Sequence, residues 1–342
     1  AEHAHHIGDK YMELLFPVGR PSRIPTVAVT GTNGKTTTSR MVSRIVQTAG
    51  LKVGLACTDG VYLDNELLMA GDMAGVRGAA TVLSDKQIEA AVLETARGGM
   101  ATRGIAFDRC DVGACLNVAG DHLGDEGIGT LDDMAVHKRQ VIERTTGTVV
   151  LNAEDPRCLA MREHTNADTV ILIAQSSNHP AIQTHIQSGG KAIVIDTIEN
   201  KPKIVLETSD NKIIPIMSVN EIPATLNGAA RHNVFNAMFS VGIGLGLGIP
   251  QKYIVSALTA FKMGVDNTPG RLNEIDGYPF KVLVDVAHNV HGIESLVEFI
   301  AQLSVRGKKI INFGVSGRQS DEDIQKFAKV TAKNFDLYIL RN

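Results

Sequence analysis

The sequence predicts an α/β protein with a central parallel sheet, a small mixed or antiparallel extension, and a second, Rossmann-like α/β unit. Three observations support this. Short apolar runs alternate with helix-period stretches over the first ~150 residues, brief β-rich pieces follow, and the alternation resumes after a Pro-Gly linker. At roughly 150 residues per domain, 342 residues allow two or three domains. We expect a lead-in over 1–24, a central domain over 25–267 and a C-terminal domain over 268–342.

The first part of the chain supplies the parallel sheet. Its strands are expected at five short apolar runs, namely 26–30, 53–57, 90–93, 112–117 and 149–152. Helical periodicity covers 37–49, and a further helix is expected over 130–143. Strands separated by helices imply parallel pairing through crossover connections, which places ligand loops at the carboxyl ends of the strands.

The later part of the chain divides into two patterns. Short β-rich pieces separated by Asn, Gly and Ser turns predict the extension at 170–174, 192–196, 203–207 and 213–218. Helices are expected over 233–247 and 251–262, and a linker over 266–270. A final alternating unit is expected at 280–285, 293–303, 309–313, 324–333 and 337–340. Because this unit stops just after a strand, we expect the C-terminal domain to be truncated.

Composition is that of an ordinary soluble globular protein. Hydrophobic residues make up 44 %, charged residues 21 %, and the formal net charge is −3. Neither a basic run nor an apolar window of ~18 residues appears, so we expect no nucleic-acid and no membrane partner. The four cysteines are irregularly spaced with no C-x-x-C pair, and we interpret them as reduced structural residues of a cytoplasmic protein.

The stretch 31–37, Gly-Thr-Asn-Gly-Lys-Thr-Thr, lies between a predicted strand and a predicted helix. Glycines let backbone N–H groups wrap a phosphate, Lys35 adds a full charge, and the Thr36 hydroxyl can ligate Mg²⁺. The spacing departs from G-x-x-x-x-G-K-[ST], because Val29 stands where the first glycine belongs. The alternative is a glycine turn with a solvated lysine.

The shortened loop resembles that of the Mur ligase family, and five further motifs follow in the family's order. They are Glu94 on a strand end, Asp121-His122-Leu123, His232-Asn233-Val234-Phe235-Asn236, Gly270-Arg271-Leu272-Asn273 and Asp285-Val286-Ala287-His288-Asn289. The resemblance covers nearly the whole chain. It implies a central P-loop domain followed by a Rossmann-like domain, and an ATP-dependent ligase that works through an acyl phosphate.

The resemblance also assigns roles to residues. It implies catalytic roles for Lys35, Glu94, His122, Lys138 and Arg271, and magnesium ligation by Thr36, Glu94 and His122, with two ions expected. ATP would be bound by Gly31, Thr32, Asn33, Gly34, Lys35, Thr36, Thr37, Asn233, Asn236, Arg271, Asp285 and His288. Lys138 would be the carbamylated lysine of many family members, or else a solvated helix lysine. Asn233 would face the nucleotide, or else cap a helix.

Within the family, Leu93-Glu94-Thr95-Ala96-Arg97-Gly98-Gly99 and Thr58-Asp59-Gly60-Val61-Tyr62 resemble the Mur-like region of cyanophycin synthetases. This implies that arginine, or another amino acid, is joined to the aspartate β-carboxylate of an acidic, poly-aspartate acceptor. Arg97 could anchor an acceptor carboxylate or form a structural ion pair, and Asp72 could bind a guanidinium or form a turn.

Two alternatives to this function stay open. One is a Mur-type ligase for another acidic acceptor, a folylpolyglutamate or a peptidoglycan precursor. The other is a catalytically silent ATP-binding scaffold module. The resemblance is also compatible with a homo-oligomer and with fusion to an ATP-grasp domain in the full-length protein.

Overall fold

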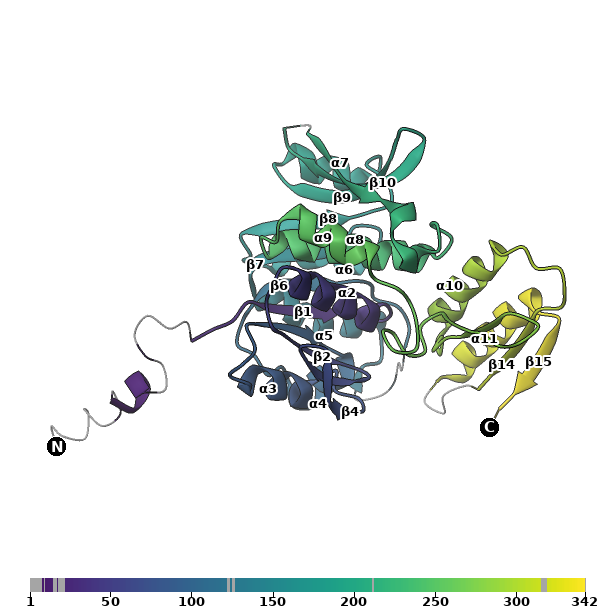
Figure 1. Cartoon of the computed structure of the whole chain (residues 1–342), viewed down its shortest axis with the longest axis horizontal. Helices are drawn as coiled ribbons and strands as arrows, with labels where there is room; N and C mark the ends of the chain where they lie inside the picture. The colour runs from purple at the N-terminus through teal and green to yellow at the C-terminus, as the bar shows by residue number, and fades with distance from the viewer. Residues whose placement is uncertain are drawn as a thin grey trace.

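The structure is a computed structural model that describes residues 8, 10–14, 17, 22–121, 124, 127–210, 212–314 and 319–341. Most of the predicted lead-in over 1–24 lies outside the described residues, and so does His122. Figure 1 shows a large sheet covered by helices, with a smaller α/β unit beside it that contains the C-terminus.

The centre of the molecule is one eleven-stranded sheet in the order β11-β10-β9-β8-β7-β6-β1-β5-β2-β3-β4. Its strands are β1 Thr26–Thr30, β2 Val53–Cys57, β3 Gly60–Leu63, β4 Glu66–Ala70, β5 Ala90–Glu94, β6 Cys110–Cys115, β7 Thr145–Asn152, β8 Thr169–Ile173, β9 Lys191–Ile198, β10 Lys201–Thr208 and β11 Ile213–Ser218. The pairing is parallel from β2 through β5, β1, β6, β7 and β8 to β9. The predicted parallel sheet is confirmed.

Helices cover both faces of this sheet. One face is packed by α2 Lys35–Thr48, α8 Arg231–Gly246 and α9 Gln251–Thr259, and the other by α3 Val76–Ser84, α4 Arg97–Arg103, α5 Leu131–Glu143, α6 Pro156–Ala160 and α7 Pro180–Gln187. Strand β1 shows the two-sided burial, because Val27 and Val29 enter one core cluster and Ala28 enters the other. Burial on both faces makes such strands near-continuous apolar runs.

The predicted extension over residues 170–218 is mixed. Strand β9 is parallel to β8, with α7 between them in the chain, and the pairs β9–β10 and β10–β11 are antiparallel. Three short 3₁₀ helices, η2 Met161–His164, η3 Val219–Glu221 and η4 Pro223–Thr225, complete this half of the chain.

The hairpin β3–β4 was not predicted from the sequence. Its turn places Asp64 and Asn65 at φ 48° and 74°, the backbone of a type I′ turn. Two adjacent residues of the Asn/Asp type are a signal for such a turn. Here they lie between strands so short that the alternation of apolar residues is hard to recognise.

The C-terminal unit contains β12 Asn273–Ile275, β13 Val282–Val284, α10 Val290–Ala301, β14 Ile310–Phe313, α11 Asp321–Asn334 and β15 Leu337–Leu340. Strands β14 and β15 pair in parallel, as the alternation predicts. The strand predicted over 280–285 is shorter and pairs antiparallel with β12 instead. Figure 1 shows this unit joined to the large sheet by an extended segment after α9.

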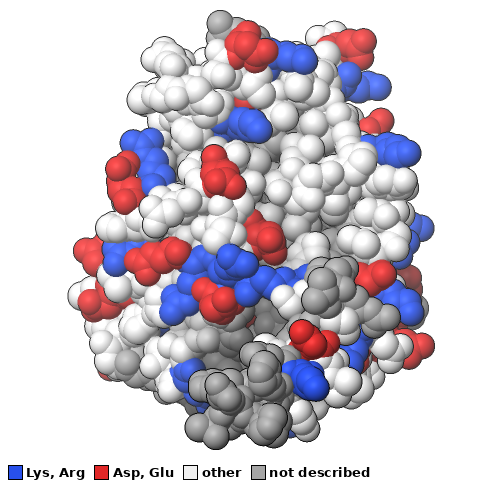
Figure 2. Space-filling model, turned by 90° about the vertical axis from the view of Figure 1, so that its left-hand side faces the viewer, with Lys and Arg blue, Asp and Glu red and all other residues white. Residues whose placement is uncertain are grey.

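The molecular surface is mixed in charge. On the face shown in Figure 2, basic and acidic side chains lie next to one another across the middle. Of the helices described, none combines the length and apolarity needed to cross a bilayer. The four cysteines are all buried free thiols, as predicted for structural residues.

Candidate active site

A cavity of about 1300 Å³ lies at the carboxyl edge of the parallel strands. Its lining comes from the loop after β1, the ends of β5 and β6, the start of α8 and the turns of the C-terminal unit. Every predicted site residue that the structure describes lines it: Gly31, Thr32, Asn33, Gly34, Lys35, Thr36, Thr37, Asp72, Glu94, Arg97, Lys138, Asn233, Asn236, Arg271, Asp285 and His288. Residues that lie up to about 260 positions apart in sequence therefore meet in one place, as parallel-sheet topology allows.

The loop over 31–37 is shaped by close contacts. Gly34 has φ 85°, and a Cβ there would lie 2.4 Å from Asn236 Oδ1 of α8, so only glycine fits. The Asn117 side chain, after β6, accepts from the Thr32 and Asn33 amides at 3.0 and 2.9 Å. It also donates to the Asn33 carbonyl at 3.1 Å. The loop opens α2 with no acidic residue in the first turn, the arrangement that favours an anion at a helix N-terminus.

Oxygen atoms gather beside this loop. The Glu94 carboxylate, 2 % exposed at the end of β5, accepts from the Thr36 hydroxyl at 3.0 Å. The amide and hydroxyl of Thr58, which follows β2, donate to Glu94 Oε2 and Oε1 at 3.0 and 2.9 Å. Hydroxyl and carboxylate oxygens are the ligands that Mg²⁺ prefers, and one or two carboxylates with substrate phosphates suffice for it. This donor set therefore fits the predicted ion.

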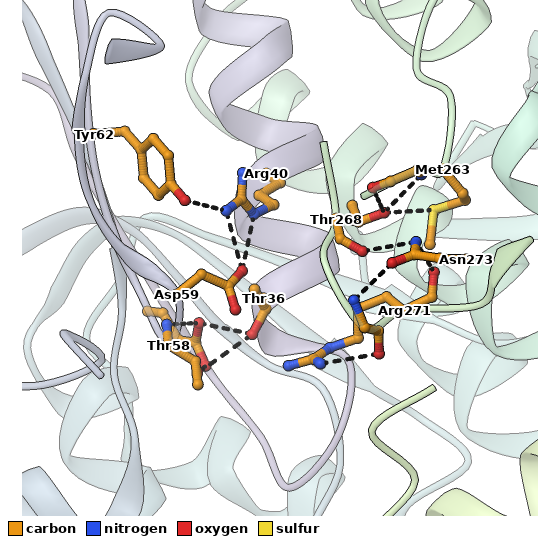
Figure 3. A network of polar contacts seen from close by, with 12 residues as sticks. Thr36, Arg40, Thr58, Asp59, Tyr62, Met263, Thr268, Arg271 and Asn273 are labelled. Carbon is orange, nitrogen blue, oxygen red and sulfur yellow. Dashed lines mark hydrogen bonds and ion pairs between the residues drawn. The ribbon is translucent and has the colours of Figure 1, made fainter. Parts of the chain in front are cut away.

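A partly buried ion pair supports the turn that contains Thr58. Arg40 of α2 donates to Asp59 Oδ2 at 3.0 and 3.3 Å and to the Tyr62 hydroxyl at 2.9 Å, as Figure 3 shows. Its guanidinium also lies 4.6 Å from the Tyr62 ring centroid. We call the loop over residues 31–37 the phosphate-type loop. The turn between β2 and β3 is therefore anchored to α2, the helix that begins in this loop.

Lys138 lies on the predicted helix but is not solvated. It points from α5 into the protein, is 2 % exposed and lines the cavity. Burial first, and then the charge of Lys35, lower its pKa to about 7. The interpretation as a solvated helix lysine is wrong, because α5 turns this position toward the sheet.

The side chains of the two asparagines of α8 are both hydrogen-bonded. Asn233 donates to the Ala224 carbonyl at 2.9 Å and accepts from Asn236 at 3.1 Å. The interpretation of Asn233 as a helix cap is wrong, because α8 begins at Arg231 and its N-cap is Ala230. Asn236 accepts from the Thr38 hydroxyl at 3.3 Å, which ties α8 to α2.

His232, beside them, also lines the cavity. Burial, with a smaller effect from His291, lowers its pKa to about 4, so its imidazole is neutral near pH 7.

The C-terminal unit contributes a third wall. Arg271 lies three residues after Thr268, and in Figure 3 its side chain extends toward Thr36 and Thr58. Asp285 accepts from the Leu272 amide at 2.9 Å, and burial raises its pKa. His288 lies 3.6 Å from Asp121, and this contact raises the histidine pKa.

Side-chain contacts join the C-terminal unit to the loop over residues 31–37. Asn33 and Asn289 exchange two amide hydrogen bonds of 3.1 Å, and Asn33 is 2.9 Å from His291 Nδ1. Asn289 is also the N-cap of α10, where its Oδ1 accepts from Gly292. The phosphate-type loop is therefore bound directly by the C-terminal unit.

The two tentative substrate residues lie on one side of the cavity. Asp72 Oδ1 accepts from the Ala74 amide at 3.1 Å, the geometry of a turn former. Arg97 is the first residue of α4 and is half-buried.

Sequence reasoning missed the contacts of Asn117, Thr58 and Asn289. Asparagine and threonine directly after strands, on the edge where ligand loops gather, were the available signal.

Comparisons with known proteins agree with this arrangement. The model of the Mur ligase middle domain matches residues 29–244, and that of the Mur ligase glutamate ligase domain matches 270–342. A cyanophycin synthetase of Synechocystis sp. is 37 % identical over 332 residues, covering 96 % of this chain and 37 % of the relative. A UDP-N-acetylmuramoyl-L-alanyl-D-glutamate–2,6-diaminopimelate ligase of Alkaliphilus metalliredigens is 23 % identical, covering 94 % of this chain and 62 % of the relative. The chain thus spans about 37 % of the length of the cyanophycin synthetase that it matches.

Two solved structures share the fold. MurF of Acinetobacter baumannii has a TM-score of 0.64 at 18 % identity, and the superposition covers 92 % of this chain and 67 % of the MurF chain. A bifunctional folylpolyglutamate synthase/dihydrofolate synthase with Mn, AMPPNP and L-glutamate bound has a TM-score of 0.65 at 20 % identity, covering 93 % and 75 %. The predicted fold, a P-loop domain with a following Rossmann-like unit, is confirmed.

Proposed function

Because this chain belongs to the Mur ligase family, we propose that it is an ATP-dependent amide ligase that joins arginine to the β-carboxylate of aspartate in cyanophycin. One observation carries the proposal: the loop at 31–37, the Glu94 carboxylate with its partners Thr36 and Thr58 (the Glu94 corner), and Arg271 of the second unit all line one cavity. An acceptor carboxylate oxygen attacks the γ-phosphorus of ATP, and ADP leaves. The amine of the incoming amino acid then attacks the acyl carbon, loses a proton and displaces phosphate.

The proposed nucleotide site uses two kinds of interaction. Backbone N–H groups of residues 31–37 and the Lys35 ammonium neutralise the triphosphate, while Asn233 and Asn236 border it on the α8 side. Thr36, Glu94 and His122 would hold magnesium, which supplies charge neutralisation at the transferring phosphoryl group. Thr58 fixes both oxygens of Glu94, so the carboxylate is oriented before ligands arrive.

The C-terminal unit excludes water in this proposal. An acyl phosphate hydrolyses unless water is kept from it, and the contacts of Asn33 with Asn289 and His291 hold the second unit over the loop. Arg271 adds positive charge opposite the Glu94 corner, and Asp285 and His288 border the nucleotide from this unit. We propose the division at 267/268 as the hinge between the two units.

Lys138 suits the role of a carbamylated lysine. Carbamylation requires a neutral amine that attacks CO₂, and a pKa of about 7 makes the amine half neutral at neutral pH. The product carries a carboxylate, which would hold a second metal ion near the acyl phosphate. A lysine with an ordinary pKa would be almost wholly protonated and unreactive.

The acceptor is assigned from similarity. The chain is 37 % identical to the cyanophycin synthetase of Synechocystis sp. and 23 % identical to the diaminopimelate-adding ligase, which favours an aspartyl acceptor over a peptidoglycan precursor. Fusion to an ATP-grasp domain, a homo-oligomer and a cytoplasmic location complete the proposal. The four buried free thiols fit a reducing compartment.

The direct test is a ligation assay on the full-length protein with ATP, arginine and short β-aspartyl-arginine primers that end in a bare aspartate. We expect ADP release that requires both primer and arginine, with a mass gain of one arginine residue in the primer. ADP release with a folate or peptidoglycan acceptor instead would overturn the acceptor assignment. ATP binding without ADP formation with any acceptor would identify a silent scaffold module.

A further inference from the structure

One wall of the cavity carries three arginine side chains. Arg77 lies in the first turn of α3, and Arg97 and Arg103 begin and end α4. The two helices start side by side, because a Cβ on Gly99 would lie only 3.1 Å from the Gly75 backbone. We call Arg77, Arg97 and Arg103 the arginine wall.

Two members of the arginine wall, Arg77 and Arg103, have charge available for a ligand. Arg77 and Arg103 are exposed, and no carboxylate within the described part of the chain lies within ion-pair distance of either. Other arginines are matched in this way, for example Arg40 with Asp59 and Arg157 with Asp132. Asp72 lines the same side, where its Oδ1 accepts from the Ala74 amide, and in the described part of the chain it forms no ion pair with Arg77 or Arg103.

The position of the wall relates it to the acceptor. Glu94 ends β5, and α4 begins three residues later, so the wall is adjacent to the corner where the acceptor carboxylate would react. The asparagines that border the nucleotide come from α8, on the opposite face of the sheet. A molecule that places one carboxylate beside Glu94 can therefore extend along α3 and α4 without crossing the nucleotide site.

We propose that Arg77 and Arg103 of the arginine wall bind carboxylates of the acceptor other than the one that reacts, above all the free α-carboxylate of its terminal aspartate. Arg97 and Arg103 are six residues apart, about 9 Å along a helix axis, which is more than one carboxylate spans. Guanidinium groups bind carboxylates bidentately and do not pair with a neutral carboxamide in this way. The inference rests on the proposed function, because it takes the aspartyl acceptor from it.

The test uses two matched primers of three β-aspartyl-arginine units ending in a bare aspartate. In one the terminal α-carboxylate is free, and in the other it is a carboxamide, so the reacting β-carboxylate is identical. We expect wild type to show a KM at least about tenfold lower for the carboxylate primer. In Arg77→Gln/Arg103→Gln this preference should fall below about threefold, with kcat and the KM for ATP unchanged.

Arg44→Gln is the matched control, because Arg44 is exposed on α2 and does not line the cavity. Fluorescence anisotropy of labelled primers with a non-hydrolysable ATP analogue measures the same preference without turnover. If the double variant keeps the wild-type preference, or wild type shows none, the inference is overturned while the proposed function stands. If neither primer supports ADP formation but anisotropy shows the carboxylate preference, the proposed function fails and the wall is still supported.

Discussion

At the scale of single residues, the site depends on polar groups whose surroundings fix their state. Glu94 keeps both oxygens engaged by Thr36 and Thr58, although it is almost wholly buried. Burial and the charge of Lys35 lower the pKa of Lys138 by more than Asp121 and the two nearby cysteines raise it. The importance of these two residues was predictable, because each lies where the order of the Mur ligase motifs expects a catalytic carboxylate or lysine. Their hydrogen-bond partners were not, because these come from strands and helices distant in sequence.

Lys138 gives a prediction about activity. Lys138→Ala should abolish turnover, because no carbamate can form, and a short-chain carboxylic acid such as acetate should restore part of it by occupying the vacated space. The measurement is the rate of ADP release with and without the added acid. Wild-type turnover in the variant would refute a role for this lysine.

Lys138 also gives a prediction about stability. Its pKa is about 7 in the folded protein and about 10.5 when unfolded, so the unfolded chain binds more protons between these values. Wild-type stability should therefore rise with pH across this window. In CO₂-depleted buffer, Lys138→Met should be more stable than wild type by about 3 kcal/mol at pH 8, and this difference should fade above pH 10.5.

Urea unfolding at several pH values measures the difference, and Lys52→Met is the control for an exposed lysine. A constant difference between pH 7 and 10.5 would contradict the assignment of the lowered pKa.

At the scale of elements, α8 packs against the phosphate-type loop and the first turn of α2, through Asn236 beside Gly34 and Thr38. The helix after the loop over 31–37 followed from hydrophobic periodicity, because its 14 residues are long enough to show it, and the strand before the loop followed from a short apolar run. The hairpin β3–β4 and the short helices α3 and α4 did not, because four to nine residues give too little of a period. Yet Arg77 and Arg97 lie on α3 and α4, and Thr58 lies in the turn that leads into β3. The missed elements therefore border much of the proposed acceptor side.

Gly34 tests how the loop is held. Gly34→Ala must place a Cβ 2.4 Å from Asn236 Oδ1 at φ 85°, so we expect a loss of stability of about 1–2 kcal/mol and at least tenfold weaker ATP binding. Gly50→Ala is the matched control, because Gly50 has φ 92° with open space around it. It should lose about 1 kcal/mol and keep its ATP affinity. Equal ATP affinities in the two variants would show that the contact with α8 does not shape the site.

At the scale of the whole molecule, the two units meet at the loop over residues 31–37. The order of motifs along the chain predicted that both would contribute to one site, and the cavity lining agrees. The pairing of Asn33 with Asn289 was not predictable, because an asparagine just before a helix is expected to cap that helix rather than to contact a distant loop. In the structure, Asn289 has both roles.

Asn289→Ser separates these roles. Serine still caps α10, so the melting temperature should change by less than about 2 °C, but its side chain is too short to reach Asn33. We expect the ratio of amide formed to ATP consumed to fall at least twofold, because water reaches the acyl phosphate. Asn334→Ser, away from the cavity, is the control. An unchanged coupling ratio would mean that the asparagine pair does not contribute to closure.

The central claim is that the γ-phosphate is transferred to a carboxylate rather than to water. A primer labelled with ¹⁸O in its terminal β-carboxylate tests it most directly when the released inorganic phosphate is analysed by mass spectrometry. The account predicts one ¹⁸O atom in each phosphate, released together with ADP and matched by one amide bond formed. Phosphate free of ¹⁸O, or the release of AMP and pyrophosphate, would contradict it.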